Sequence, residues 1–219
     1  MQLIPNRFYF RMSYPCRFVK QMPLDDEGDS LLDLSESCRI DNFAAMDGQR
    51  NFAEVRLAWN DAGLGLEVNV KGKEQTPQGD SSRPRSSDGV TLWLDTRGDR
   101  TFHRGSRYCH QFHFLAAGGG RDKDEHLFLQ SKVHRALHDA TFADASAVQL
   151  RVEAIRGGYR LEAFLPAEAM NGFDPVEHPK LGFYYAVRDL ELGEQTLGPG
   201  ADLPFADDPS LWATLHLAK

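Results

Sequence analysis

The sequence predicts an all-β protein, an antiparallel two-sheet β-sandwich of the jelly-roll or immunoglobulin-like kind. Three observations support this class: about eight segments alternate apolar and polar residues with a period of two, no stretch sustains the spacing of an amphipathic helix, and no internal repeat occurs. With 219 residues, 41% of them hydrophobic and 26% charged, the chain is long enough to bury one large core. We therefore expect a single domain over residues 1–219.

Two parts of this domain differ in their sequence pattern. Residues 1–52 contain three prolines and the acidic run at 25–29, which interrupt every candidate period. This part is therefore expected to be an irregular segment that packs on the sandwich. Residues 53–219 carry the alternating segments and are expected to form its core.

The core begins with a predicted β-hairpin. Residues 53–59 alternate, residues 60–63 supply a turn, and residues 64–70 alternate again. A polar loop at 71–87 follows, long enough to have a function of its own. Strands are then expected over 90–95 and 108–114, separated by a loop at 96–106 and ended by the glycines at 118–120.

The second half of the chain continues the same pattern. Residues 127–129 indicate a short strand, whereas 132–145 fit neither a strand nor a helix well. A second hairpin is predicted over 148–154 and 159–165, turning at Gly157-Gly158 and stopped by Pro166. Strands over 183–187 and 211–217 complete the sandwich.

Charge and cysteine content exclude several classes of protein. The formal net charge is −7 and the isoelectric point about 5.6, so a nucleic-acid backbone would be repelled. The three cysteines, Cys16, Cys38 and Cys109, form no CxxC pair, which argues against a disulfide scaffold and a zinc finger.

Targeting signals are not evident in the sequence. No stretch approaches the roughly 20 apolar residues that span a bilayer. Arg7, Arg11 and two prolines interrupt residues 1–16, where a leader needs an apolar stretch. We therefore expect no membrane partner and a cytoplasmic location, with export of a wrongly started chain as the alternative.

The order of the segments is more specific than the class. The chain carries, in order, AEVRLAW at 53–59, GLGL at 63–66, SDGVTLWLD at 87–95, QF at 111–112, GGYRLEAFLP at 157–166, LGF at 181–183 leading to RD at 188–189, and WATLHL at 212–217. This ordered series resembles the family 9 carbohydrate-binding modules, within the wider DOMON-like group of sandwich domains. The resemblance covers residue 53 to the end of the chain.

The resemblance implies a noncatalytic sandwich that holds the end of a sugar chain between aromatic rings, often with bound calcium. Several ligand positions depart from the family pattern. Arg85 replaces one clamping tryptophan, and Phe205-Ala206 lies near the second. Thr91 stands at an acidic position and His113 at a basic one. The resemblance therefore supports the family's scaffold for this chain more strongly than it supports the family's ligand.

Strand alternation places candidate sugar-binding side chains on one face. If Val90 and Phe112 point to the core, their neighbours on the same strands point away from it. The alternative is that the N-terminal fifty residues cover this face and make Trp93 a core residue. The candidate ligand-binding residues are Arg85, Thr91, Trp93, Gln111, His113, Tyr184, Arg188 and Phe205.

Histidines and acidic residues are the two candidate types of metal ligand in this sequence. His110 and His113 lie three apart on a predicted strand, so they project to opposite faces and cannot share an ion. Calcium needs six to eight oxygens, and four acids lie at strand ends where loops converge. The alternative is that these acids are solvated and cap turns. The candidate calcium ligands are Asp88, Asp95, Asp99 and Asp189.

Catalytic patterns are weak in this sequence. Cys109 precedes His110, but adjacent strand residues face apart, and no GxSxG, HExxH or phosphate-binding glycine loop occurs. A catalytic pair of carboxylates of the glycosidase kind is kept as an alternative, and Glu162 is the acid best placed on a sheet surface. The expectation is a noncatalytic domain that requires no cofactor.

Two alternatives to saccharide binding come from other classes. One is a haem-binding electron-transfer domain, since some DOMON-like sandwiches hold haem with Met and His or Lys, and Met46 and Met170 are present beside many histidines. The other is a structural or interaction domain without a small ligand. The oligomeric state is left open.

Overall fold

The computed structural model describes residues 4–24, 30–201 and 203–219, so the acidic run at 25–29 lies outside the described residues. Within them the chain forms eleven strands. These are β1 (Ser13–Phe18), β2 (Ala53–Asn60), β3 (Gly63–Lys71), β4 (Gly89–Asp95), β5 (Cys109–Gly119), β6 (Glu125–Ser131), β7 (Gln149–Ile155), β8 (Gly158–Pro166), β9 (Lys180–Asp189), β10 (Gly193–Thr196) and β11 (Ala213–Ala218).

Helical residues in the described part occur only as short 3₁₀ turns. They are η1 (Asn6–Tyr9), η2 (Glu36–Cys38), η3 (Ala44–Asp47), η4 (Pro84–Ser86), η5 (Ala145–Ala147), η6 (Ala167–Ala169) and η7 (Pro209–Leu211). No described helix has the length and apolar character needed to cross a bilayer. The all-β class is therefore confirmed.

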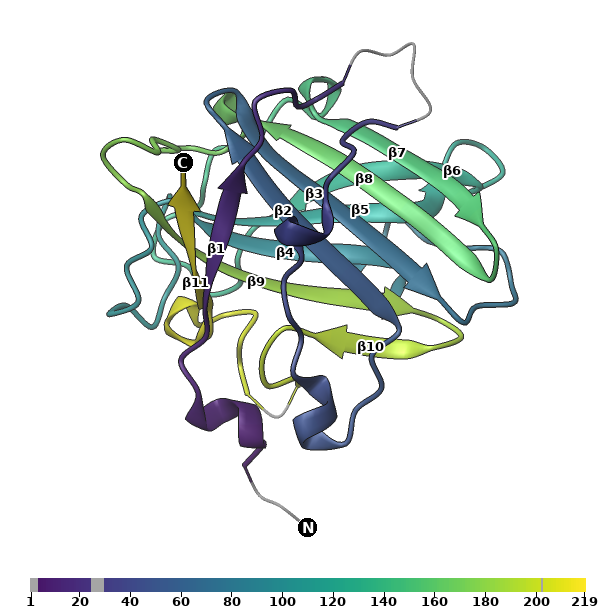
Figure 1. Cartoon of the computed structure of the whole chain (residues 1–219), viewed down its shortest axis with the longest axis horizontal. Helices are drawn as coiled ribbons and strands as arrows, with labels where there is room; N and C mark the ends of the chain where they lie inside the picture. Colours follow the sequence, from purple (N-terminus) through teal and green to yellow (C-terminus); the bar gives the residue numbers. More distant parts are fainter. Residues whose placement is uncertain (1–3, 25–29, 202) are drawn as a thin grey trace.

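The strands form one continuous, nearly closed sheet. Its order is β6-β5-β4-β9-β11-β1-β2-β3-β8-β7, and β10 pairs with β9 off this path. The two ends of the order, β6 and β7, approach each other (Figure 1). Hydrogen bonding between neighbouring strands thus continues without the interruption that would separate the two sheets of a sandwich.

The first strand corrects the prediction for residues 1–52. β1 lies between β11 and β2 and runs parallel to both, whereas the sequence predicted only antiparallel strands and an irregular N-terminal segment. Tyr14 and Cys16 are buried, following a period of two that Pro15 obscures. β1 pairs with β2 only at Arg17 and Phe18, so Pro15 lies outside that paired stretch.

Both predicted hairpins are confirmed by their ladders. β2 pairs with β3 from Ala53 and Val70 to Asn60 and Gly63, and Asn60 Oδ1 closes the turn by accepting from the N–H of Ala62 and Gly63 at 2.9 and 3.0 Å. β7 pairs with β8. The turn between them uses Gly157 at φ +73°, a left-handed conformation that glycine adopts without strain.

The N-terminal segment covers the outer face of the β2-β3-β8 half. Its apolar side chains form a small second core with two strand residues, Ala58 and Phe164. Glu162 anchors the segment by accepting from Ser30 Oγ at 2.7 Å and from the N–H of Leu31 at 3.0 Å. Glu162 is therefore a buried structural acceptor. The remaining members of this second core are Met22, Leu31, Leu32, Leu34 and Cys38.

Candidate functional site

The predicted ligand residues on β4, β5 and β9 lie next to one another. Trp93 is paired with Gln111 on β5 and with Tyr184 on β9, and Thr91 is paired with His113. We call these five side chains the Trp93 face. The alternation of the sequence thus places them as neighbours on one side of the sheet.

Hydrogen bonds within the Trp93 face pair its polar atoms with one another. Trp93 Nε1 donates to Gln111 Oε1 at 2.9 Å, and Gln111 Nε2 lies 3.2 Å from His113 Nε2. Because an amide nitrogen only donates, His113 Nε2 accepts and the ring proton resides on Nδ1, which lies 2.9 Å from Thr91 Oγ1. Ser131 Oγ lies 3.0 Å from His113 Nε2.

Two loops close this face. Phe205 comes from the loop residues 197–201 and 203–212, which we call the closing loop. It meets Trp93 edge-on at 5.3 Å and stacks on Tyr184 at 4.3 Å between ring centroids. The Arg85 guanidinium, from η4, lies 5.5 Å from the indole centroid. Trp93 is only 1% exposed and His113 is fully buried.

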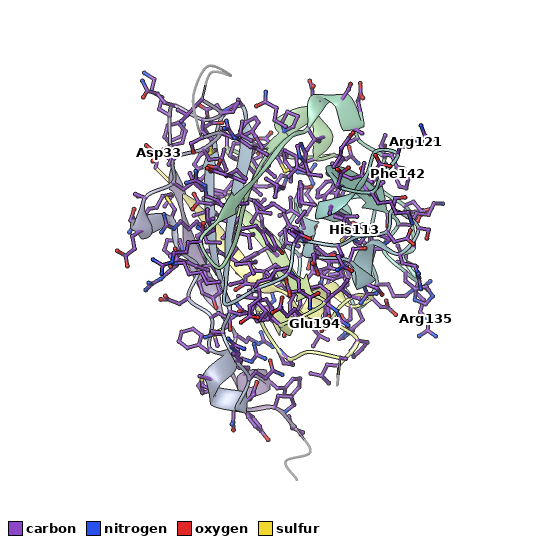
Figure 2. The ribbon with its side chains drawn as sticks, turned by 90° about the vertical axis from the view of Figure 1, so that its right-hand side faces the viewer. Asp33, His113, Arg121, Arg135, Phe142 and Glu194 are labelled. Carbon is purple, nitrogen blue, oxygen red and sulfur yellow. The ribbon has the colours of Figure 1, made fainter. Side chains whose placement is uncertain are left out.

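The Trp93 face is therefore not the open surface that the sequence predicted. Its cover comes from the closing loop and η4, whereas the N-terminal segment covers the other half of the molecule. His113, which is labelled in Figure 2, has no exposed surface. Arg188 lies apart from the network, half-buried, with its Nη1 3.5 Å from Glu194 Oε2. Burial, followed by the charge of Arg85, lowers the pKa of His113 to about 4, so the face is neutral near pH 7.

Asp88 and Asp189 converge as predicted for calcium ligands, but a lysine lies between them. The buried Lys73 Nζ is 3.1 Å from Asp88 Oδ2 and 3.1 Å from Asp189 Oδ1. Burial by itself would lower the pKa of Lys73, and the bonds to the two carboxylates outweigh it and raise that pKa. An ammonium group thus supplies the positive charge at this end of β4.

Asp95 and Asp99 lie at the opposite end of β4. Asp95 is buried and accepts from the N–H groups of Arg97 and Asp99, both at 3.0 Å. Burial raises the pKa of Asp95 to about 6. The four predicted acids therefore form two separate pairs, and in the described part of the chain no three His, Cys, Asp or Glu residues converge to hold a metal.

The candidate nucleophile Cys109 and the candidate haem ligands Met46 and Met170 do not form a site together. Burial, with the charge of Asp95, raises the pKa of the Cys109 thiol to about 12, which keeps it protonated and poorly nucleophilic. Met170 is buried, whereas Met46 is 41% exposed on η3, so these two side chains lie in different environments.

An open cavity lies where the sequence analysis placed no site. Its volume is about 470 Å³. Three parts of the chain surround it: residues 7–11 in and after η1, the loop after β4, and the closing loop. Three consecutive aromatic side chains line it, with Phe8 44%, Tyr9 68% and Phe10 52% exposed. We call it the basic pocket. Its lining residues are Arg7, Phe8, Tyr9, Phe10, Arg11, Arg100, His103, Pro199, Ser210 and Leu211.

A buried arginine holds the aromatic residues in place. Arg7 Nε donates to Asp47 Oδ2 at 2.5 Å, and its Nη1 donates to the carbonyl oxygen of Thr196 at 2.6 Å. Its Nη2 donates to Gln49 Oε1 at 2.8 Å. The sequence signal for this pocket is the run RFYFR at 7–11, because three adjacent aromatic residues cannot all face the core of a sheet.

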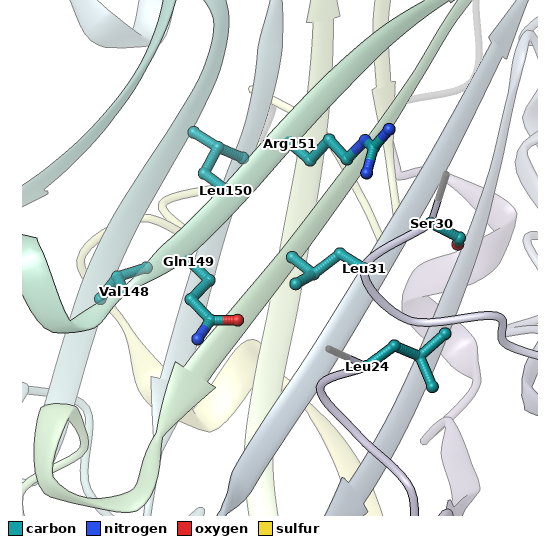
Figure 3. A pocket seen from close by; sticks show the side chains of 7 residues that line it. All are labelled: Leu24, Ser30, Leu31, Val148, Gln149, Leu150 and Arg151. Atoms are coloured by element: carbon teal, nitrogen blue, oxygen red, sulfur yellow. The ribbon is translucent and has the colours of Figure 1, made fainter. Parts of the chain in front are cut away.

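A further cavity of about 390 Å³ lies between the N-terminal segment and β7 (Figure 3). Leu24 and Leu31 approach it from the segment, and Gln149 and Arg151 approach it from the strand. It exposes no aromatic ring, in contrast to the basic pocket. Its other lining residues are Ser30, Val148 and Leu150.

Comparison with known proteins identifies the fold. No protein-family model and no curated protein sequence matches the chain. A family 9 carbohydrate-binding module from Caldicellulosiruptor kristjanssonii in complex with cellotriose is similar, with a TM-score of 0.60, 15% identity and coverage of 95% of this chain and 93% of that one. The glucose complex gives a TM-score of 0.61 and 14% identity over 94% and 95% of the two chains.

A third similar structure is described as a putative carbohydrate-binding protein from Bacteroides uniformis ATCC 8492. Its TM-score is 0.54, at 14% identity over 94% of this chain and 99% of that one. At such identities the likeness establishes a fold like that of family 9 modules. Ligand and site must be argued from side chains.

Proposed function

We propose that this protein is a noncatalytic carbohydrate-binding module that binds a saccharide in the basic pocket. The observation that carries the proposal is the set of three exposed rings, Phe8, Tyr9 and Phe10, held beside an open cavity by Arg7. Sugar rings present apolar C–H faces that stack on aromatic side chains, while their hydroxyls need hydrogen-bonding partners. Large exposed aromatic groups on one side of a protein mark binding surfaces.

The size of the surface favours an oligosaccharide. The pocket volume of about 470 Å³ falls within the range of about 300–1,000 Å³ that is common for ligand sites. Two further hollows continue from it: one of about 420 Å³ shares His103 with the basic pocket, and one of about 250 Å³ shares Arg104 with the first hollow. The second of them is lined by the exposed ring of Phe102 and by Tyr108. Successive sugar units therefore have successive places to lie.

The Trp93 face is the less favourable place for a saccharide. Its hydrogen-bonding groups already pair with one another, and binding there requires Arg85 or Phe205 to leave the indole. A ligand would have to replace contacts that the folded protein already makes. The fold similarity to sugar-bound modules supports the ligand class, and the open pocket supports the location.

A binding experiment with matched variants tests this proposal. Cellotriose and an array of neutral and acidic oligosaccharides are titrated into the wild type, Tyr9→Ala and Phe10→Ala by calorimetry. We expect at least one saccharide to bind the wild type and both variants to weaken it about tenfold, the loss of one stacked ring. Phe142→Ala is the control, because Phe142 is 53% exposed and lies far from the N-terminal turns (Figure 2). Absence of binding across the array, or equal binding by Tyr9→Ala and Phe10→Ala, would reject it.

We also propose that Asp88 and Asp189 require no calcium, because Lys73 Nζ occupies the space between their oxygens. An ammonium group and a divalent cation cannot share that position. Adding calcium or a chelator is therefore expected to leave the thermal unfolding midpoint of the wild type unchanged. A calcium-dependent rise in the wild type that Asp189→Asn abolishes would contradict this.

A further inference from the structure

The basic pocket carries positive charge that no carboxylate of the pocket balances. Four of its lining residues, Arg7, Arg11, Arg100 and His103, are basic, and none of the ten is Asp or Glu. Two of the four are paired elsewhere, because Arg7 bonds Asp47 and His103 Nδ1 lies 3.0 Å from Asp208 Oδ2. Arg11 and Arg100 form no ion pair within residues 4–24, 30–201 and 203–219.

Arg11 and Arg100 act on each other through their charges. Burial, and next the charge of Arg11, lower the pKa of Arg100. Two like charges held together in this way cost free energy, and an anion between them would remove that cost.

The hydrogen-bonding groups of Arg100 also have unused capacity. Its Nη2 donates to the carbonyl oxygen of Ser210 at 3.2 Å, whereas its Nε is buried and lacks a hydrogen-bond partner in the described structure. A planar guanidinium with a free N–H edge is suited to a carboxylate or to another flat or tetrahedral oxyanion. Arg100 and Ser210 both line the pocket, so the guanidinium is part of the cavity wall, although its Nε atom is buried.

From these observations we infer that the basic pocket binds an acidic saccharide, one whose sugar ring carries a carboxylate or sulfate. The acidic substituent lies between Arg11 and Arg100, and the apolar face of the same or the next ring stacks on Tyr9 or Phe10. This inference rests on the proposed function and narrows its ligand class. A neutral glucan would fill the aromatic part of the pocket and leave both guanidinium groups unpaired.

Titration calorimetry with four probes tests the inference: trigalacturonate as a carboxylate, a sulfated heparin tetrasaccharide, neutral cellotriose and inorganic phosphate. We expect one of the two acidic saccharides to bind at least about tenfold more tightly than cellotriose, the worth of one charge-assisted contact. Its affinity falls as salt rises from low to physiological concentration, because exposed charges are screened. Whichever acidic saccharide binds identifies the substituent.

Variants connect this affinity to the two arginines. Arg11→Gln and Arg100→Gln are each expected to reduce the preference for the acidic saccharide about tenfold, since each removes one cation from the anion. Arg121→Gln is the control, because Arg121 is exposed at the periphery far from the N-terminal turns (Figure 2). Arg11 is itself exposed, so its variant stays informative even if Arg100→Gln fails to fold.

The outcomes separate this inference from the proposed function. Cellotriose binding that depends on Tyr9, with no preference for acidic probes, would overturn the inference and leave the proposed function in place. Binding of inorganic phosphate as tightly as the acidic saccharide would show a simple anion site and overturn the inference as well. Absence of any saccharide binding would remove both.

Discussion

The Trp93 face and the basic pocket involve similar residue types but differ in whether their polar groups and aromatic rings already have partners within the protein. Each has aromatic rings beside a guanidinium group, and residues of the closing loop contact the Trp93 face and line the basic pocket. In the Trp93 face the indole, amide, imidazole and hydroxyl groups bond to one another. In the basic pocket the rings face solvent and Arg100 Nε has no partner in the described structure. Residue composition alone therefore does not identify a binding site. Exposed rings and hydrogen-bonding groups without a partner in the folded protein do.

The physical cause lies in the cost of burying polar groups. A buried group without a hydrogen bond is unfavourable, so a closed face is stable only when its polar atoms are paired internally. The Trp93 face meets that condition, and a ligand has little to gain there. In the basic pocket Arg11 is exposed and Arg100 Nε is buried without a partner in the described structure, so an incoming ligand can add interactions there.

The largest expected difference between the two regions is in stability. Trp93→Ala removes a side chain that is 1% exposed, and we expect it to lower the free energy of unfolding by about 3–5 kcal/mol. Phe10→Ala removes a ring that is 52% exposed, and we expect a change within about 0.5 kcal/mol. Urea unfolding of both variants measures this. Similar losses for the two would contradict the distinction between a core face and a binding pocket.

A second prediction concerns acid. His113 titrates at about 6.5 when unfolded and at about 4 in the folded protein, so between these pH values the unfolded state binds more protons. Its contribution to stability is complete above pH 6.5 and is lost as the pH falls to 4. Such a shift corresponds to roughly 3 kcal/mol for one buried group.

The variant His113→Asn isolates that contribution. The buried Asp95 carboxyl, with its pKa raised to about 6, has the opposite dependence and loses stability as the pH rises from 3.8 to 6. His110, whose pKa burial lowers to about 4, changes in the same direction as His113. Urea unfolding at pH 4.5 and 7.5 should therefore show a smaller pH dependence in His113→Asn than in the wild type. An unchanged dependence would count against a neutral buried imidazole.

The smallest expected effect tests how firmly the Trp93 face is closed. Arg85→Ala removes an exposed cation–π partner, so stability should change by less than about 1 kcal/mol. All three tryptophans are buried, at 2% exposure or less, and acrylamide should quench the wild type weakly. Removing Arg85 should uncover one side of Trp93 and increase the quenching. Arg83→Ala, two residues away and exposed, is the control, and equal quenching in both variants would show that Phe205 alone closes the face.

Most strands were predictable because alternation is a local property. Residues 53–70, 90–95 and 148–165 form the expected hairpins and strand, and the neighbours of Trp93 follow from the same parity. β1 was missed because Pro15 interrupts a short pattern whose pairing partner, β11, lies at the far end of the chain. β10 was missed because its four residues show no period of their own.

The sites were less predictable because they depend on contacts between distant residues. Lys73 lies 116 residues from Asp189, and no spacing in the sequence indicates that the two meet. The covering of Trp93 by Phe205 joins segments that are more than a hundred residues apart. The run RFYFR carried a local signal, but its exposure depends on Arg7 reaching Asp47 and Thr196.

The amino-acid sequence alone thus determined the all-β class, the hairpins and the side of each strand on which a residue lies, since these follow from a period of two along the chain. Only the tertiary structure decided which face was closed, which acids met a lysine and which arginines were left unpaired. Those outcomes depend on where loops from distant parts of the chain pack, and loop packing leaves no periodic trace in the sequence.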